Sequence, residues 1–243
     1  MTKFRTTARV VGVVYIAGFV VGIGGNSLIQ SILGTPDHLA TVAANSLLLA
    51  SGALLWLLTA VGDAAHGVLM LPVLRQHHER LAFGYLASRI VDAVFIAIMV
   101  LFLLLQIPLG NEYVKAAAPA AFSLQALSTV SVQGSQYAYA IGMCALGLSG
   151  LMLNYVFYRA RLVPRWLAVW GLVGYAVIFG GMVTEVMGSG LGLLSSLPGG
   201  LWEMFIGGWL IAKGFQSAAA VAPAARPRTP PEPLTPQAAS TNA

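Results

Sequence analysis

Residues 81–106 read LAFGYLASRIVDAVFIAIMVLFLLLQ, a stretch in which Arg89 and Asp92 are the only charged residues. An α-helix rises about 1.5 Å per residue, so about 20 apolar residues are enough to cross the ~30 Å hydrocarbon layer of a bilayer. The stretch exceeds that minimum and stops before Pro108 and Gly110. It therefore predicts a transmembrane helix that contains two opposite charges.

Apolar stretches of comparable length recur along the chain, separated by short polar or basic segments. Together with residues 81–106 they give six predicted spans, the other five being residues 10–33, 43–74, 137–158, 166–187 and 199–215. We therefore expect an all-α fold, a polytopic bundle of six transmembrane helices formed by residues 1–215. The basic turn at residues 159–165 is so short that the spans on either side should be antiparallel neighbours.

The composition excludes an ordinary soluble domain. Hydrophobic residues make up 58% of the chain and charged residues 9%, whereas a soluble domain is about a quarter charged. The thirteen Lys and Arg residues stand in short groups between apolar stretches, a pattern typical of membrane orientation and not of a nucleic-acid-binding face. Cys144 is the only cysteine, which excludes an internal disulfide or a cysteine-based metal cluster. We expect lipid as the surrounding partner, with no metal, cofactor or nucleic acid.

The basic residues also predict the topology. With the N-terminus in the cytoplasm, eleven Lys and Arg residues are cytoplasmic, Lys115 is outside and Arg89 is embedded. The inverted topology reverses that count, so the positive-inside rule favours cytoplasmic N- and C-termini and a location in the cell (inner) membrane. A cleaved signal peptide is the competing interpretation of residues 10–33, although that stretch is long and no clear small-residue cleavage pattern follows it.

Three segments outside the spans have their own signals. Residues 34–37, Gly-Thr-Pro-Asp, predict a short turn. Residues 108–136 are rich in Ala, Ser and Gln, and we expect a polar connection, part of which could lie along the membrane interface as a short helix. Residues 216–243 are rich in Pro and Ala and predict a disordered cytoplasmic tail.

Five ionisable residues interrupt the predicted spans, namely Asp63, His66, Arg89, Asp92 and Glu203. A charge at the centre of a membrane helix costs about 2.5 to 3.5 kcal/mol, so these side chains should face inward and pair. Counted from the nearest cytoplasmic basic residues at 1.5 Å per residue, all five lie about 13 to 18 Å deep, close to the midplane. The i, i+3 spacing within the second and third spans puts each pair on one helix face. The sequence predicts one polar layer shared by three helices.

This layer has a functional and a structural interpretation. Arg89 and Asp92 should meet Asp63 or Glu203 across the bundle, and three ionised acids beside one Arg would leave two excess negative charges. We therefore expect a protonated His66 or at least one neutral carboxyl. The structural alternative is that these groups fasten the helices, since side-chain hydrogen bonds in membranes contribute about 0.6 to 2 kcal/mol each. A ligand or proton site is favoured because intramembrane ionisable groups are functional by default.

Weaker candidates are better explained by structure. His77 and His78 resemble a metal-binding fragment but stand in a predicted cytoplasmic turn without further ligands nearby. Glu185 falls near the outer end of its span, and Asn26 and Gln30 are typical of hydrogen bonds between packed helices. The paired glycines in three spans should permit close helix contact. No Gly-x-Ser-x-Gly turn, His-Glu-x-x-His helix or Walker loop occurs in the sequence, so familiar catalytic classes lose support.

Several segments together resemble the bacterial membrane-protein family of domain of unknown function 4386. They are Ala8 through Tyr15, Arg89 followed three residues later by Asp92, Pro164-Arg165-Trp166-Leu167 through Tyr175, and Glu203 before Trp209-Leu210 and Lys213-Gly214. The likeness covers about residues 8–215. It implies an uncharacterised multi-pass protein and supplies no substrate, reaction or cofactor.

Three functions remain open at this point. The first is a midplane site that binds or translocates a small solute or proton, with Asp63, Asp92 and Glu203 as proton-bearing acids and Arg89 as the counter-charge; six helices are few for a transporter, which favours a homodimer. The second is a membrane enzyme in which Glu203 or Asp92 works with His66 on a lipid-like substrate. The third is a non-catalytic membrane component whose charged layer only fixes the helix register.

Overall fold

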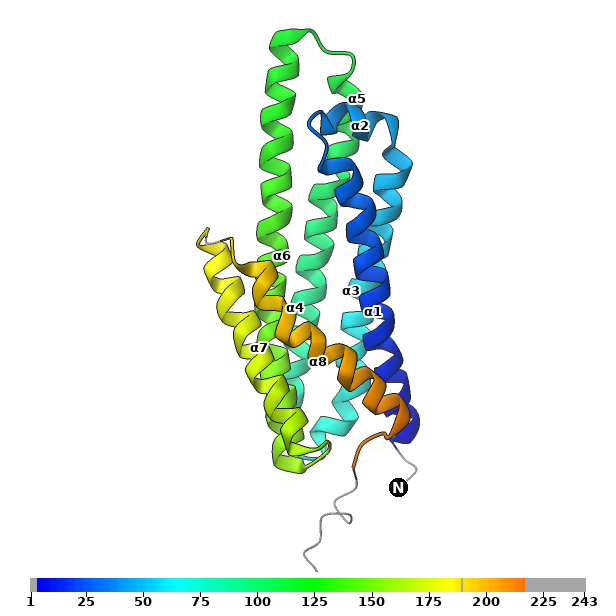
Figure 1. Cartoon of the computed structure of the whole chain (residues 1–243), viewed down its shortest axis with the longest axis vertical. Helices are drawn as coiled ribbons and strands as arrows, with labels where there is room; N and C mark the ends of the chain where they lie inside the picture. The colour runs from blue at the N-terminus through cyan, green and yellow to red at the C-terminus, as the bar shows by residue number, and fades with distance from the viewer. Residues whose placement is uncertain (1–3, 189, 217–243) are drawn as a thin grey trace, which may run out of the picture.

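The computed structural model describes residues 4–188 and 190–216, and within these residues all regular secondary structure is helical (Figure 1). The described helices are α1 (Arg5–Leu33), α2 (His38–Ala44), α3 (Ser46–Arg75), α4 (Glu79–Leu104), α5 (Gln106–Tyr113), α6 (Ala118–Ala160), α7 (Arg165–Val186) and α8 (Gly192–Ala212). The prediction of an all-α fold is confirmed. The predicted tail, apart from Gln216, lies outside the described residues.

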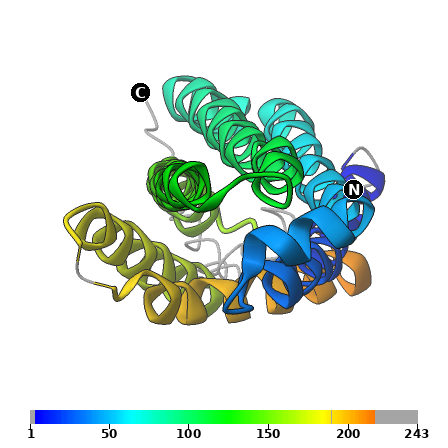
Figure 2. The same ribbon diagram turned by 90° about the horizontal axis from the view of Figure 1, so that it is seen from above.

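Six of these helices form a closed ring. Each packs against the next in the order α1, α3, α4, α6, α7 and α8, and α8 packs against α1 to complete the circle. Figure 2 shows this ring from above, with α2 and the connection that follows α5 lying across its upper end. The helices therefore surround a common centre, to which each can contribute side chains.

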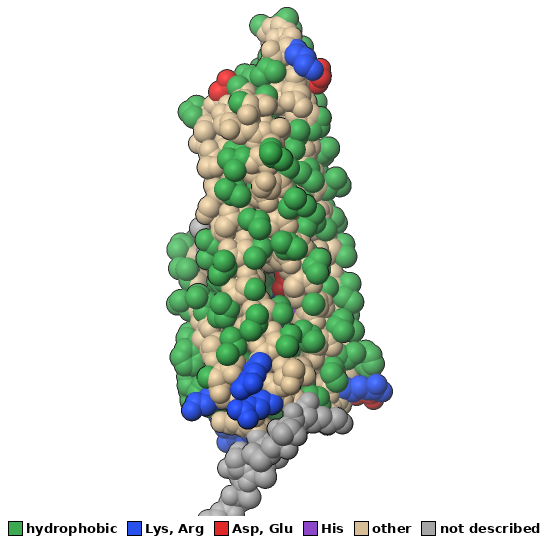
Figure 3. Space-filling view, turned by 90° about the vertical axis from the view of Figure 1, so that its right-hand side faces the viewer, with side chains coloured by type: hydrophobic (Ala, Val, Ile, Leu, Met, Phe, Trp, Pro, Cys, Tyr) green, Lys and Arg blue, Asp and Glu red, His purple; other side chains and the backbone are tan. Residues whose placement is uncertain are grey.

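Five helical segments of the described chain are long and apolar enough to cross a membrane, with α4 and α5 counted as one segment, Glu79–Tyr113. α8, which includes serines, several glycines, Pro198 and Glu203, is not among these five segments. Figure 3 shows apolar side chains spread over the middle of the molecule, with Lys and Arg gathered at its lower end. A surface that is apolar in the middle and charged at its ends is that of a multi-pass membrane protein.

The segment at residues 108–136 differs from the expectation of a polar connection. Most of it is helical, because α5 continues the direction of the third span and α6 begins at Ala118, with Pro119 in its first turn. Proline fits the first turn of a helix, where its missing N–H is not needed. The hydroxyl of Ser131 donates to the carbonyl of Phe102 on α4 at 2.8 Å. Ser131, a polar residue of the predicted connection, thus joins α6 to α4.

Each predicted glycine pair places one glycine against a neighbouring helix. A Cβ at Gly25 would lie 3.0 Å from the carbonyl oxygen of Gly52, so α1 and α3 cross closely there. A Cβ at Gly181 would overlap Ser195 on α8, whereas one at Gly180 would meet no atom within 4 Å. The absence of a side chain is therefore needed at one member of the pair, where it permits close helix packing.

Candidate functional site

Arg89 is the centre of the polar layer. Its Nη1 lies 3.0 Å from Asp63 Oδ1 on α3 and 3.6 Å from Asp92 Oδ2 one turn along α4. Arg89 is 3% exposed and Asp92 1% exposed. Buried charges require partners because lipid and protein interior supply no water. The sequence predicts that Arg89 and Asp92 meet Asp63 or Glu203 across the bundle, and the acid that pairs with Arg89 is Asp63.

His66 lies on the same face of α3 as Asp63, one turn away. Its Nδ1 forms a hydrogen bond with the Tyr85 hydroxyl on α4, and its ring meets the edge of Tyr15 on α1 at a centroid distance of 4.4 Å. His66 is 1% exposed, and its Nε2 has no hydrogen-bond partner in the described residues. One imidazole nitrogen is thus fixed while the other remains free to accept or donate a proton.

Glu203 enters the layer from α8. The Tyr175 hydroxyl on α7 donates a hydrogen bond to Glu203 Oε1. The neighbouring Trp202 is fully buried, donates from Nε1 to the Leu167 carbonyl at 2.7 Å and meets Tyr15 edge-on. The partner of Glu203 within the described residues is therefore a tyrosine, and the two ion pairs of Arg89 are with aspartates.

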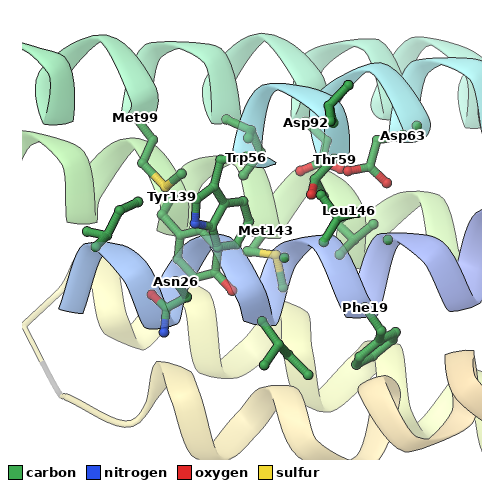
Figure 4. A pocket seen from close by; sticks show the side chains of 18 of the residues that line it. Phe19, Asn26, Trp56, Thr59, Asp63, Asp92, Met99, Tyr139, Met143 and Leu146 are labelled. Carbon is green, nitrogen blue, oxygen red and sulfur yellow. The ribbon is translucent and has the colours of Figure 1, made fainter. Parts of the chain in front are cut away.

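All five predicted residues, Asp63, His66, Arg89, Asp92 and Glu203, line one cavity of about 1010 Å³ inside the ring. This volume is at the upper end of the range for small-molecule sites, about 300 to 1,000 Å³. Figure 4 shows Asp63 and Asp92 together toward one end of this central cavity, and Asn26 and Met99 toward the other. The layer is therefore also the wall of a space large enough for a ligand.

Aromatic and sulfur-containing side chains form much of the remaining wall. Trp56 on α3 and Tyr139 on α6 meet edge to face at 5.9 Å, between Met99 and the two aspartates (Figure 4). Met143 and Phe19 complete this part of the lining. Aromatic faces carry negative quadrupole charge, and methionine adapts to irregular apolar shapes. These walls suit an apolar body, particularly one that bears a positive charge.

The two ends of the central cavity differ. Toward the end of the molecule that holds Lys115, the lining includes the polar residues Gln30, Gln136 and Glu185 beside the apolar Leu33 and Leu103. The Oε2 of Glu185 accepts a hydrogen bond from the Gly192 N–H at 2.7 Å. Toward the basic end, the lining stops at the aromatic residues beside His66. Closer to the basic end lies a packed apolar core that includes Met70, which is not part of the cavity lining. The cavity therefore has polar residues at one end, which we call its polar end. Packed apolar side chains close the other end, which we call its sealed end.

Several buried polar groups in the wall have no hydrogen-bond partner in the described residues. Both carboxylate oxygens of Asp92 lack one, as does Nε of Arg89. With Asp63, Asp92 and Glu203 ionised, the layer would carry two negative charges more than the Arg89 guanidinium neutralises. Unpaired buried groups cost about 1 to 3 kcal/mol each. A site of this kind gains stability by taking up protons or a cationic ligand.

The tyrosines of the site did not emerge from sequence reasoning. Four of them lie around the layer, namely Tyr15, Tyr85, Tyr139 and Tyr175. They were missed because a charge in an apolar span marks an ionisable residue and gives no signal for an aromatic one. Tyr85 stands one turn before Arg89, whose guanidinium carbon lies 6.0 Å from its ring centre. That i, i+4 spacing is the signal that could have identified it.

The other sequence candidates have separate positions. Asn26, Gln30 and Glu185, which were assigned to packing or to a solvated helix end, are all on the cavity wall. His77 and His78 lie in the α3–α4 turn, where His78 Nδ1 accepts from the Leu81 N–H at 3.3 Å and caps α4. No group of three or more His, Cys, Asp or Glu residues in the described chain is arranged to hold a metal ion.

Comparison with known proteins identifies a family. A family model described as a domain of unknown function, DUF4386, matches residues 10–214, a range that includes all six helices of the ring except the first residues of α1. No curated protein and no solved structure matches the chain.

Proposed function

The chain belongs to the family described as domain of unknown function DUF4386, and we propose that it binds or translocates a small solute or proton at its central cavity. The observation that carries this proposal is the coincidence of the polar layer with the cavity wall. Five ionisable side chains from α3, α4 and α8 face one space of about 1010 Å³. Side chains that only fastened helices would need no such space around them.

The membrane arrangement is part of the proposal. α8 completes the ring and is 21 residues long, which supports six spans. Basic residues gather at the end of the molecule that holds Arg75 and Arg165 (Figure 3), so the positive-inside rule orients this end and both termini toward the cytoplasm of the inner membrane. The polar end of the cavity then faces outward and the sealed end faces the cytoplasm.

Each residue of the layer has a proposed role. Asp63, Asp92 and Glu203 carry exchangeable protons, and Arg89 is the fixed counter-charge that holds Asp63 and Asp92 in place. A cation that enters displaces a proton from a carboxyl, so that the charge of the layer is conserved. The unpartnered Nε2 of His66 provides a further proton acceptor at the sealed end.

Carboxyl modification tests this proposal without knowledge of the solute. Dicyclohexylcarbodiimide is apolar and reacts with protonated carboxyls, so in the purified protein it should modify Asp63 or Glu203, as read by peptide mass spectrometry. Glu112, which pairs with Lys115 at 3.1 Å on the exposed surface, is the matched control. Modification of neither Asp63, Asp92 nor Glu203 would show that the layer bears no accessible exchangeable proton and would overturn the proposal.

A membrane enzyme acting on a lipid-like substrate is the second candidate. The supporting observation is the position of His66, which lines the same cavity as Asp92 and Glu203 and whose Nε2 has no hydrogen-bond partner in the described residues. This arrangement has the components of acid–base catalysis. Lipid extracts incubated with wild type and with His66→Ala or Asp92→Asn separate the two functions. Lipid turnover that both substitutions abolish favours the enzyme, and turnover indifferent to both excludes it.

The proposal includes a homodimer, because six helices are few for a transporter. Light scattering of the purified protein, corrected for bound detergent, measures the oligomeric state. A monomer in both detergent and reconstituted nanodiscs would exclude this part and leave the cavity proposal in place.

A further inference from the structure

The central cavity reaches the side of the molecule between α1 and α3. The two helices cross closely at Gly25 and Gly52 and are more loosely packed toward the basic end, where a Cβ at Gly62 would lie 3.8 Å from Val14 Cγ1. A Cβ at Gly18 would meet no atom within 4 Å, and the nearest atom to one at Gly22 would be Thr59 Oγ1 at 3.9 Å. We call the space bounded by Gly18, Gly22, Thr59 and Gly62 the α1–α3 window.

The window has a definite frame. Its upper edge is the crossing at Gly25 and Gly52, and its lower edge is the contact between the Tyr15 and His66 rings at 4.4 Å. All four window residues line the central cavity. The outward-facing Leu58, which is 59% exposed, also lines it. The cavity therefore continues through the wall of the ring to the outer surface.

Figure 3, which views the molecule from the side of α1 and α3, shows this opening at mid-height, with acidic side-chain atoms visible inside it. The side chain of Asp63 is 21% exposed, in contrast to 1% for Asp92 and 4% for Arg89. Gly18 and Gly62 lie about midway along their helices. An opening at that height faces the hydrocarbon of the bilayer and not water.

The chemistry behind the window selects the charge of a ligand. The single guanidinium of the wall, Arg89, forms ion pairs with Asp63 at 3.0 Å and Asp92 at 3.6 Å, while its Nε and Nη1 have no hydrogen-bond partner in the described residues. Glu203 adds a third acid to the same wall. Asp92 lies 1% exposed without a hydrogen-bond partner for either oxygen. The wall thus holds three acids against one guanidinium, and a cationic ligand would offset this excess of negative charge.

The remaining walls select the shape of a ligand. The wall includes the aromatic rings of Trp56, Tyr139 and Phe19 (Figure 4). It also includes the thioethers of Met99 and Met143. Aromatic faces attract organic cations through the negative charge of the ring quadrupole. A compact inorganic cation would leave these walls unused and would not partition into the bilayer in front of the window. An apolar molecule with a positive charge matches both features.

Building on the proposed function, we propose that the α1–α3 window admits a lipophilic organic cation from the bilayer to the acids of the polar layer. Such a ligand carries its charge on an ammonium or phosphonium centre surrounded by apolar groups. Its centre lies beside Asp63, Asp92 and Glu203, and its apolar groups contact the aromatic wall. Binding of one monovalent cation releases one proton from a carboxyl, which conserves the charge of the site.

Two probes of matched shape and opposite charge test the ligand class. Tetraphenylphosphonium and tetraphenylborate are offered to the purified full-length protein in detergent, and binding is measured by equilibrium dialysis. We expect saturable phosphonium binding that is roughly tenfold tighter than borate binding, equivalent to about 1.4 kcal/mol. Asp63→Asn and Glu203→Gln should weaken phosphonium binding, and the exposed control Glu112→Gln should not. Equal binding of the two probes, or no binding of either, would overturn the ligand class.

Bulk in the window tests the route. Gly18→Phe fills a position where a side chain meets no atom within 4 Å, and Gly180→Phe does the same on α7 away from the cavity. Phosphonium association from lipid vesicles should slow several-fold with Gly18→Phe and remain unchanged with Gly180→Phe. Gly22→Leu gives a second blocking variant if Gly18→Phe does not fold. Unchanged association with a folded blocking variant would overturn entry through the window.

The outcomes separate this inference from the proposed function. If tetraphenylphosphonium fails to bind but dicyclohexylcarbodiimide still modifies Asp63 or Glu203, the ligand class is wrong and the proton-bearing site remains. If the carbodiimide modifies no carboxyl of the layer, the proposed function fails and this inference fails with it. Protection of Glu203 or Asp63 from the carbodiimide by tetraphenylphosphonium, and not by tetraphenylborate, supports both.

Discussion

Arg89 Nη1 lies 3.0 Å from Asp63 Oδ1, and this ion pair joins α4 to α3 in the wall of the central cavity. The guanidinium is almost fully buried while the carboxylate is partly exposed, because the α1–α3 window opens on the Asp63 side. The pair joins two neighbouring helices, and the Asp63 carboxylate in it remains partly exposed.

Loss of Arg89 should strongly destabilise the protein. Arg89→Gln leaves three acids without a counter-charge, and breaking a buried ion pair by removing one partner costs about 3 to 5 kcal/mol. Thermal unfolding in detergent measures the effect. The matched control is Arg75→Gln, because Arg75 pairs with Glu79 at 2.7 Å on an exposed surface, where an ion pair contributes about 0 to 1 kcal/mol. Equal stability of the two variants would contradict the structural role of Arg89.

Glu203→Gln should keep the fold and lose the function. The amide oxygen of Gln can still accept the hydrogen bond from Tyr175, so the melting temperature should stay the same or rise, since functional sites commonly sacrifice stability. Thermal unfolding of the variant beside wild type measures this. A protein that unfolds after this substitution would show that the carboxylate is a structural partner, and the transporter and enzyme hypotheses would both lose a central residue.

Adjacent glycines on α7 should respond oppositely to alanine. Gly181→Ala forces a methyl group into Ser195 on α8 and should cost about 1 to 3 kcal/mol, the usual effect of overpacking. Gly180→Ala meets no atom within 4 Å and should stabilise α7 by about 0.4 to 1 kcal/mol. Melting temperatures of the two variants decide the point. A similar loss in both would mean that α7 and α8 are not packed as described.

Cysteine labelling should confirm the proposed orientation. In a Cys144→Ser background, Lys115→Cys should react with a membrane-impermeant maleimide in intact cells, and Gln76→Cys in the α3–α4 turn should react only after the cells are opened. Lys115 and Gln76 lie at opposite ends of the molecule, beyond the C-termini of α5 and α3 respectively. Labelling of Gln76→Cys in intact cells would reverse the orientation and place the polar end of the cavity toward the cytoplasm.

Prediction from sequence succeeded where a single helix carries the signal. The apolar length of residues 81–106 is a local property, and it indicated α4 without knowledge of its neighbours. The segment at residues 108–136 gave the opposite result, because the polar Ser131 bonds to α4 within the bundle and Ser128 bonds to Gln106 of α5. Local polarity does not reveal whether its partner is water or another helix.

The same distinction applies to the candidate site. Asp63, His66, Arg89, Asp92 and Glu203 could be named from the sequence because a charge in an apolar span carries a desolvation cost that demands an explanation. Equal distance from the cytoplasmic ends even predicted a shared depth. Tyr139 and Trp56 could not be identified as site residues from the sequence, because an aromatic side chain is as stable against lipid as in a cavity wall.

The sequence by itself determined that this protein is an all-helical multi-pass membrane protein with ionisable residues inside its apolar helices, because hydropathy and helix propensity are properties of each segment. Only the tertiary structure decided that Arg89 pairs with Asp63 and that Glu203 bonds to Tyr175. It also decided that the layer borders a cavity with an opening between α1 and α3. These features depend on how helices are rotated and spaced around the ring, and residues far apart in the chain set that geometry together.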